Sequence, residues 1–175
     1  MKEEEDGETN RGFATKENIM ALQPENRTGN IFPVHADLRQ RVGTENVLRW
    51  ALEAPQTLEA PIAEQLKPDF LGFRPQMLLT LMSFSYATGY YGSEDIERAF
   101  RFDRTVRYIC ARSFPEAVVI RKFRRQYRAA LDQCLSYVLQ EAAAELGIPD
   151  GPELEPQIVS TTREKIELAV IMDRD

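Results

Sequence analysis

Arginine and lysine side chains are concentrated between residues 98 and 128. This stretch holds ten basic and two acidic residues, a local charge of about +8, so the rest of the chain carries about -14 within a formal net charge of -6. Arg121, Arg124, Arg125 and Arg128 occupy positions i, i+3, i+4 and i+7, which places four guanidinium groups along one side of a helix. Like charges in such a stripe repel one another unless an anion lies across them. The spacing therefore predicts a surface for a polyanion, with nucleic-acid phosphate as the leading candidate.

Further cations extend this predicted surface. They are Arg98, Arg101, Arg104, Arg107 and Lys122. Glu94 and Glu97 lie close to the first of these arginines in the sequence and offer them carboxylate partners. A solvated helix face, or pairing within the protein, therefore stays open as the alternative to phosphate contact. Tyr90 and Tyr91 present a similar choice between stacking on a base and packing in a turn.

The remaining reactive side chains do not form a recognisable catalytic or metal-binding set. Cys110 and Cys134 lie far apart among apolar positions, and His35 is the one histidine. A zinc site needs about four clustered ligands, so we expect neither a metal ion nor another cofactor. The cysteines are expected to be buried, reduced thiols.

The chain shows no targeting or membrane-spanning pattern. Its first residues, 1–6, are acidic and lack an apolar run, so we expect neither a signal nor a transit peptide and a cytoplasmic location. The most apolar stretch, 77–91, is interrupted by polar residues and is shorter than the roughly 20 residues that span a bilayer. We expect a core helix there and no contact with a membrane.

Apolar spacing of three and four predicts an all-α fold: a compact multi-helix domain with a helix-turn-helix-like arrangement, one long C-terminal helix and flexible termini. Residues 1–29 are expected to form an acidic mobile tail, and 30–72 a helical lead-in with a proline-containing connection. The main helical domain is predicted over 73–147, with Pro75 and Gly89 at the two ends of its first helix and Asp103 as the cap of a later short helix. Its long helix is expected from about 117 to 146, followed by a linker and a short helix over 162–172 within the final segment, 148–175.

Four short motifs occur in a fixed order within this central domain. They are FRPQMLL at 73–79, YATGYYGS at 86–93, IERAFRFD at 96–103, and Pro115 followed by IRKFRR at 120–125. Their order and spacing resemble the N-terminal domain of bacterial insertion-sequence transposases of the DDE type, the InsH-like group. About 70 of the 175 residues take part in the resemblance.

The resemblance implies an all-helical module that binds the terminal DNA of a transposon, ahead of an RNase-H-like domain with metal-binding carboxylates. After Leu146 the chain has 29 residues, too few for that second domain, so we expect no enzymatic activity from this chain. The expected function is that of a transposase DNA-binding module on double-stranded DNA. The alternative is a helical interaction module that pairs with itself or with a full-length transposase through a Leu131, Leu135 and Leu139 ridge.

Overall fold

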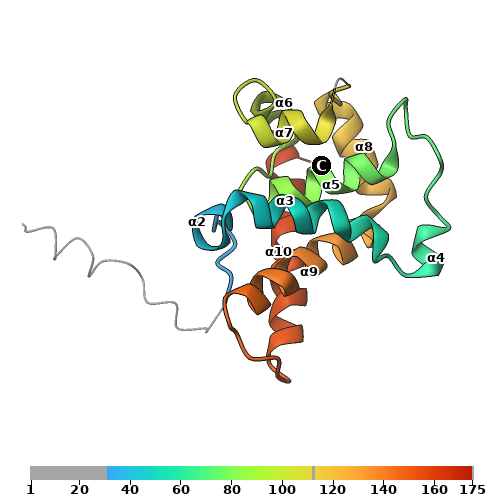
Figure 1. Ribbon diagram of the computed structural model, residues 1–175. Helices are drawn as coiled ribbons and strands as arrows, with labels where there is room; N and C mark the ends of the chain where they lie inside the picture. The colour runs from blue at the N-terminus through green and yellow to red at the C-terminus, as the bar shows by residue number, and fades with distance from the viewer. Residues whose placement is uncertain (1–30, 112, 175) are drawn as a thin grey trace, which may run out of the picture.

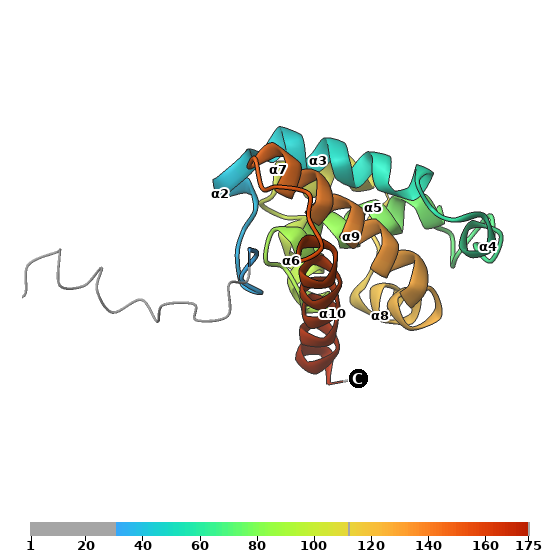
Figure 2. The ribbon, with the colours of Figure 1, turned by 90° about the horizontal axis from the view of Figure 1, so that it is seen from below.

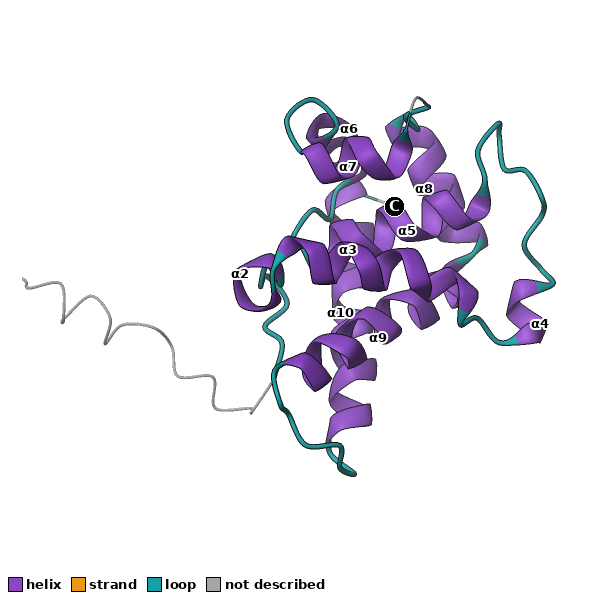
Figure 3. Cartoon of the chain, in the orientation of Figure 1, coloured by secondary structure: helices purple, strands orange, loops and turns teal. Residues whose placement is uncertain are grey.

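The computed structural model describes residues 31–111 and 113–174, and within these ranges it contains helices and no named strand. The all-α prediction is confirmed (Figure 3). The helices, labelled as in Figure 1, are α2 (Arg39–Val42), α3 (Thr44–Glu53), the 3-10 helix η1 (Ala54–Gln56), α4 (Ala60–Ala63), α5 (Pro75–Ala87), α6 (Ser93–Ala99), α7 (Arg104–Cys110), α8 (Ala117–Gln126), α9 (Arg128–Glu145) and α10 (Leu154–Asp173). The predicted acidic tail, 1–29, lies outside the described residues.

Helix α5 is the centre of the fold, and it packs against α3, α7 and α9. It begins at Pro75, where a proline is tolerated because the first helical N–H groups lack intrahelical acceptors. From Leu78 to Ala87 every residue of α5 is buried, including Ser83 and Ser85. A left-handed Gly89, with a φ of 90°, follows its C-terminus as the sequence predicts. The prediction of a core helix in the apolar stretch is therefore confirmed.

Helices α6 and α7 are two short helices joined by residues 100–103. The Asp103 carboxylate caps α7 by accepting hydrogen bonds from the backbone N–H groups of Thr105 (2.8 Å) and Val106 (3.2 Å). This predicted cap is confirmed. The Glu97 carboxylate on α6 accepts a hydrogen bond from the Ala117 N–H (2.9 Å) and so satisfies the N-terminus of α8.

The predicted long helix from 117 to 146 is wrong, because it divides into α8 and α9 at Tyr127. The backbone of Tyr127 (φ -119°, ψ 37°) leaves the helical region. Its ring packs 4.9 Å from the Phe123 ring and 5.6 Å from the Phe70 ring, centroid to centroid. The helix breaks here without a proline or glycine, so the sequence carries no local signal for the break.

The C-terminal helix is longer than predicted: α10 begins at Leu154 rather than at 162. Pro156 lies in its first turn, where the missing N–H costs no intrahelical hydrogen bond. Helix α10 packs on α9 and reaches α6, as Figures 1 and 2 show. Trp50 of α3 belongs to the same hydrophobic core as apolar residues of α9 and α10. In the described chain these three helices therefore share one core.

Candidate nucleic-acid interface

Arg124 does not lie on the outer face predicted for it. It falls four residues after Ile120 and seven after Ala117, and both of these are buried on the inner face of α8. Its side chain is 1% exposed and its Nη2 donates to the Asp173 carboxylate at 2.6 Å, while Nη1 lies 3.3 Å from the Tyr86 hydroxyl. The predicted four-arginine outer stripe is therefore wrong at this position.

The Asp173 carboxylate also ties α10 to α6. It accepts hydrogen bonds from the Ser93 backbone N–H (2.8 Å) and the Ser93 hydroxyl (2.5 Å). Burial by itself would raise the pKa of Asp173, but the bonds from Ser93 and the Arg124 guanidinium outweigh it and hold the pKa below its ordinary value. Arg124 thus has a structural role, because it closes the contact between α8, α5 and the end of α10.

Three other cations of α8 reach the surface. Lys122 and Arg125 are exposed and line a hollow with Lys67 and Asp69 of the connection before α5. Arg121 is half-buried and shares a second hollow with Arg98 of α6. These cations lie along the outer side of α8. Lys67 was not among the candidate site residues of the sequence analysis.

Arg128 belongs to α9, beyond the break at Tyr127. Its guanidinium lies 4.0 Å from the Glu167 carboxylate of α10, and both side chains are well exposed. An exposed pair at this distance contributes little to stability. Arg128 is therefore accessible but no longer continues the line of α8.

The arginines of the α6–α7 pair project into solvent. Arg98, Arg101, Arg104 and Arg107 are all exposed. Arg98 is paired with the Asp95 carboxylate, so the intramolecular alternative holds for this residue. We call Arg101, Arg104 and Arg107 the α7 arginine group; none of them makes a salt bridge with another residue of the described ranges.

Two acidic residues close in sequence to the α7 arginine group, Asp103 and Glu97, have other partners. Asp103 caps α7 and accepts a hydrogen bond at 2.8 Å from the Arg39 guanidinium, which the Asp37 carboxylate also holds. Glu97 caps α8, as described above. These two carboxylates therefore support the helices that carry the arginines, and among the described residues neither forms a salt bridge with the α7 arginine group.

Two exposed aromatic side chains lie among these arginines, and the sequence analysis missed both. Phe102 in the α6–α7 turn is 64% exposed, and Tyr108 on α7 is 66% exposed. The signal was present in the spacing, because Val106, Ile109 and Cys110 form the inner face of α7 and leave position 108 outside.

The two tyrosines that the sequence offered for stacking occupy other roles. Tyr91 is buried; its hydroxyl donates to the Val34 carbonyl and accepts a hydrogen bond from Lys165 Nζ at 2.9 Å. Tyr90 is half-buried, with its ring beneath the Arg39 guanidinium. Packing in the turn is therefore what these residues do in this fold.

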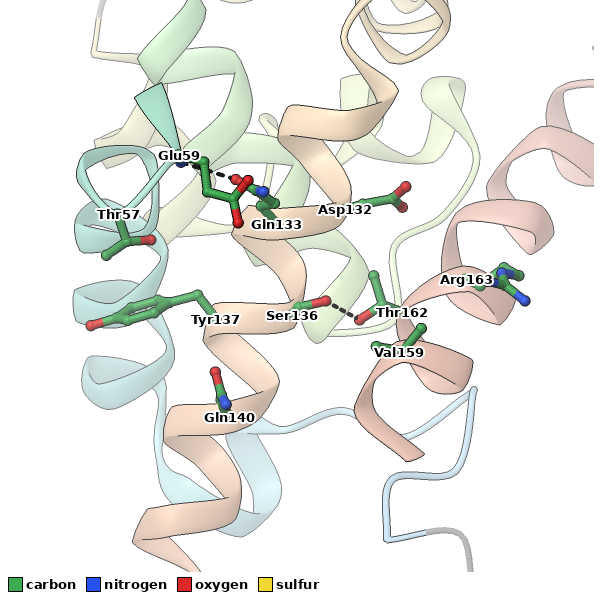
Figure 4. Close-up of a pocket in the computed structure, with 10 residues that line it drawn as sticks. All are labelled: Thr57, Glu59, Asp132, Gln133, Ser136, Tyr137, Gln140, Val159, Thr162 and Arg163. Atoms are coloured by element: carbon green, nitrogen blue, oxygen red, sulfur yellow. Dashed lines mark hydrogen bonds between the residues drawn. The ribbon is translucent and has the colours of Figure 1, made fainter. Parts of the chain in front are cut away.

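A polar hollow of about 410 Å³ lies between the segment before α4, α9 and α10 (Figure 4). Two hydrogen bonds join residues that line it: the Ser136 and Thr162 hydroxyls are 3.0 Å apart, and the Gln133 side-chain oxygen accepts from the Glu59 N–H at 3.2 Å. Burial raises the pKa of Asp132, and the positive charges of Arg128 and Arg163 partly offset this increase. We interpret the hollow as a hydrogen-bonded seam between helices.

The ridge proposed for self-association is not available on the surface. Leu131, Leu135 and Leu139 are fully buried in the core, so the expected exposed part of this ridge is wrong. Cys110 and Cys134 are buried as predicted, and burial raises the pKa of each thiol to about 12. Within the described ranges no group of three His, Cys, Asp or Glu side chains is placed to hold a metal ion.

No protein-family model, no curated protein and no solved structure matches this chain. In the part of the chain that the structure describes, no helix combines the length and apolar character needed to cross a membrane.

Proposed function

We propose that this chain is a DNA-binding module of a transposase and that it holds the phosphates of transposon-end duplex DNA. The observation that carries the proposal is the α7 arginine group: three exposed guanidinium groups, without salt bridges among the described residues, in a chain whose net charge is -6. Such unpaired like charges favour a bound polyanion. Arg121, Lys122 and Arg125 on α8 extend the proposed contact surface, and the motif resemblance supplies the transposon end as the DNA.

Arginine suits this role because its planar donors match phosphate oxygens, and such contacts position a protein on DNA without reading sequence. The proposal is restricted to Arg101, Arg104, Arg107, Arg121, Lys122 and Arg125. Arg124 is excluded because its guanidinium is held by Asp173, and Arg98 is weakened by its pairing with Asp95.

The proposal is tested by replacing two arginines of the α7 group with glutamine. If Arg104 and Arg107 each contact one phosphate, the Arg104→Gln, Arg107→Gln variant should make the negative slope of log affinity against log salt shallower by about 2 units. The matched control is Arg163→Gln on α10, another exposed arginine. Equal slopes for all three proteins in fluorescence anisotropy titrations with duplex DNA would remove the α7 group from the interface.

A further inference from the structure

Exposed aromatic rings and exposed arginines occur together around the start and the outer side of α7. Phe102, Arg104, Arg107 and Tyr108 fall within seven residues, and all four are exposed. Exposing rings of this size forgoes about 25 cal/mol per Å² of apolar area that burial would have gained. The inner face of α7 is already filled by Val106, Ile109 and Cys110, so these rings have no place in the core.

The positions of the two rings are fixed by the fold. Tyr108 follows Arg104 by four residues, so the two side chains lie on the same side of α7, whereas Arg107 points about 100° away around the helix. The Phe102 ring packs edge-on against the Tyr90 ring at 6.4 Å. The Asp103 cap then holds the turn that carries Phe102 against the start of α7. Both aromatic side chains therefore project from ordered backbone.

The combination has a specific chemical use. Arginines hold a phosphodiester backbone, and flat aromatic rings stack on bases, but a ring can reach the face of a base only where that base is unpaired. A paired duplex offers phosphates to this surface and hides the faces of its bases. An exposed phenylalanine, which has no hydrogen-bonding group, contributes to nucleic-acid binding by stacking.

We propose that Phe102 and Tyr108 stack on unpaired bases, so that the α7 surface prefers DNA with a locally single-stranded segment over intact duplex. This inference rests on the proposed DNA-binding function and adds the kind of DNA that the site selects. The α7 arginine group holds the phosphates on either side of the unpaired bases, and the two rings supply the preference.

The test compares two DNAs of the same sequence, an intact duplex and a duplex with a short gap that leaves a few bases unpaired. The wild-type chain should bind the gapped DNA about tenfold or more tightly than the duplex. In the Phe102→Ala, Tyr108→Ala variant this preference should disappear while duplex affinity changes by less than about twofold. Tyr108→Phe retains a ring and should retain the preference.

Val159→Ala on α10 is the matched control for loss of an exposed apolar side chain. Val159 is exposed like the two rings but lines the separate hollow of Figure 4. A 2-aminopurine base in the gap gives a second readout: its fluorescence should fall when the wild-type chain binds and stay unchanged with the double alanine variant. Equal wild-type affinity for the two DNAs, or a preference that survives in the double alanine variant, would overturn the inference alone. Absence of salt-dependent binding to either DNA would overturn the proposed DNA-binding function as well.

Discussion

The Asp173 carboxylate holds three helices together with one side chain. It lies at the end of α10, pairs with Arg124 of α8 and accepts two hydrogen bonds from Ser93 of α6. Both members of the ion pair are almost fully buried. Breaking a buried pair by removing one partner is costly, because an uncompensated charge is left in the interior.

Asp173→Asn is therefore expected to lower the free energy of unfolding by about 3 to 5 kcal/mol, since it removes the carboxylate charge that lies 2.6 Å from the buried Arg124 guanidinium. Urea unfolding followed by circular dichroism measures this change. Glu167→Gln, which removes the exposed partner of Arg128, is the matched control and should change the stability by less than about 1 kcal/mol. An equally small decrease in the free energy of unfolding in both variants would show that the buried pair stabilises the fold no more than the exposed pair does.

Lys165 is a second buried charge, on α10. Its Nζ donates to the Val34 carbonyl (2.7 Å), the Tyr86 carbonyl (3.3 Å) and the Tyr91 hydroxyl (2.9 Å). Burial lowers the pKa of Lys165 to about 8, partly countered by Asp37. The amine thus connects the segment before α2 to the central helix.

The lowered pKa of Lys165 predicts a pH-dependent difference between the wild-type chain and Lys165→Met. Between pH 8 and 9.5 the unfolded chain binds more protons at this site than the folded chain, so wild-type stability should rise relative to the variant by on the order of 2 kcal/mol. The buried thiols titrate in both proteins and cancel in the difference. Urea unfolding at several pH values gives this difference, and a constant difference would contradict a lowered Lys165 pKa.

At the scale of the element, α7 depends on its cap. Asp103 both accepts two backbone N–H groups of α7 and pairs with Arg39. Asp103→Ala removes both interactions and should cost about 2 kcal/mol, whereas Asp103→Asn keeps a capping oxygen and should recover about 1 kcal/mol of that loss. Thermal unfolding of the two variants tests this order. Equal destabilisation would mean that the cap does not contribute.

The elements that the sequence predicted well are those whose signals are local. Pro75 and Gly89 mark the two ends of α5, and Asp103 marks the start of α7; all three act within a few residues of themselves. The break at Tyr127 and the early start of α10 were missed. At the first, Tyr127 packs against Phe70, which is far away in the sequence. At the second, Pro156 lies in the first turn of α10 and not in a linker.

The site was predicted only in part, for a similar reason. Arg104 and Arg107 are exposed as expected because their exposure follows from helical spacing alone. Arg124 was misplaced because its partner, Asp173, lies 49 residues further along the chain and no local pattern links the two. A buried position for an arginine is expected only when the carboxylate that pairs with it is known.

At the scale of the whole molecule, charge is separated rather than mixed. The basic stretch between residues 98 and 128 carries about +8 against about -14 for the remainder. The fold removes Arg124 from the surface and leaves cations exposed on α7 and α8. The proposed association with DNA should therefore depend strongly on salt, because each phosphate contact would release condensed counterions.

The salt dependence of duplex DNA binding by the unaltered chain tests this account most directly. With four to six phosphates held by the cations of α7 and α8, log affinity should fall against log salt with a slope of about -4 to -5. Anisotropy titrations over a range of salt concentrations give this slope. A slope near zero, or no detectable binding at low salt, would contradict the claim that the exposed arginines of this fold bind a phosphodiester backbone.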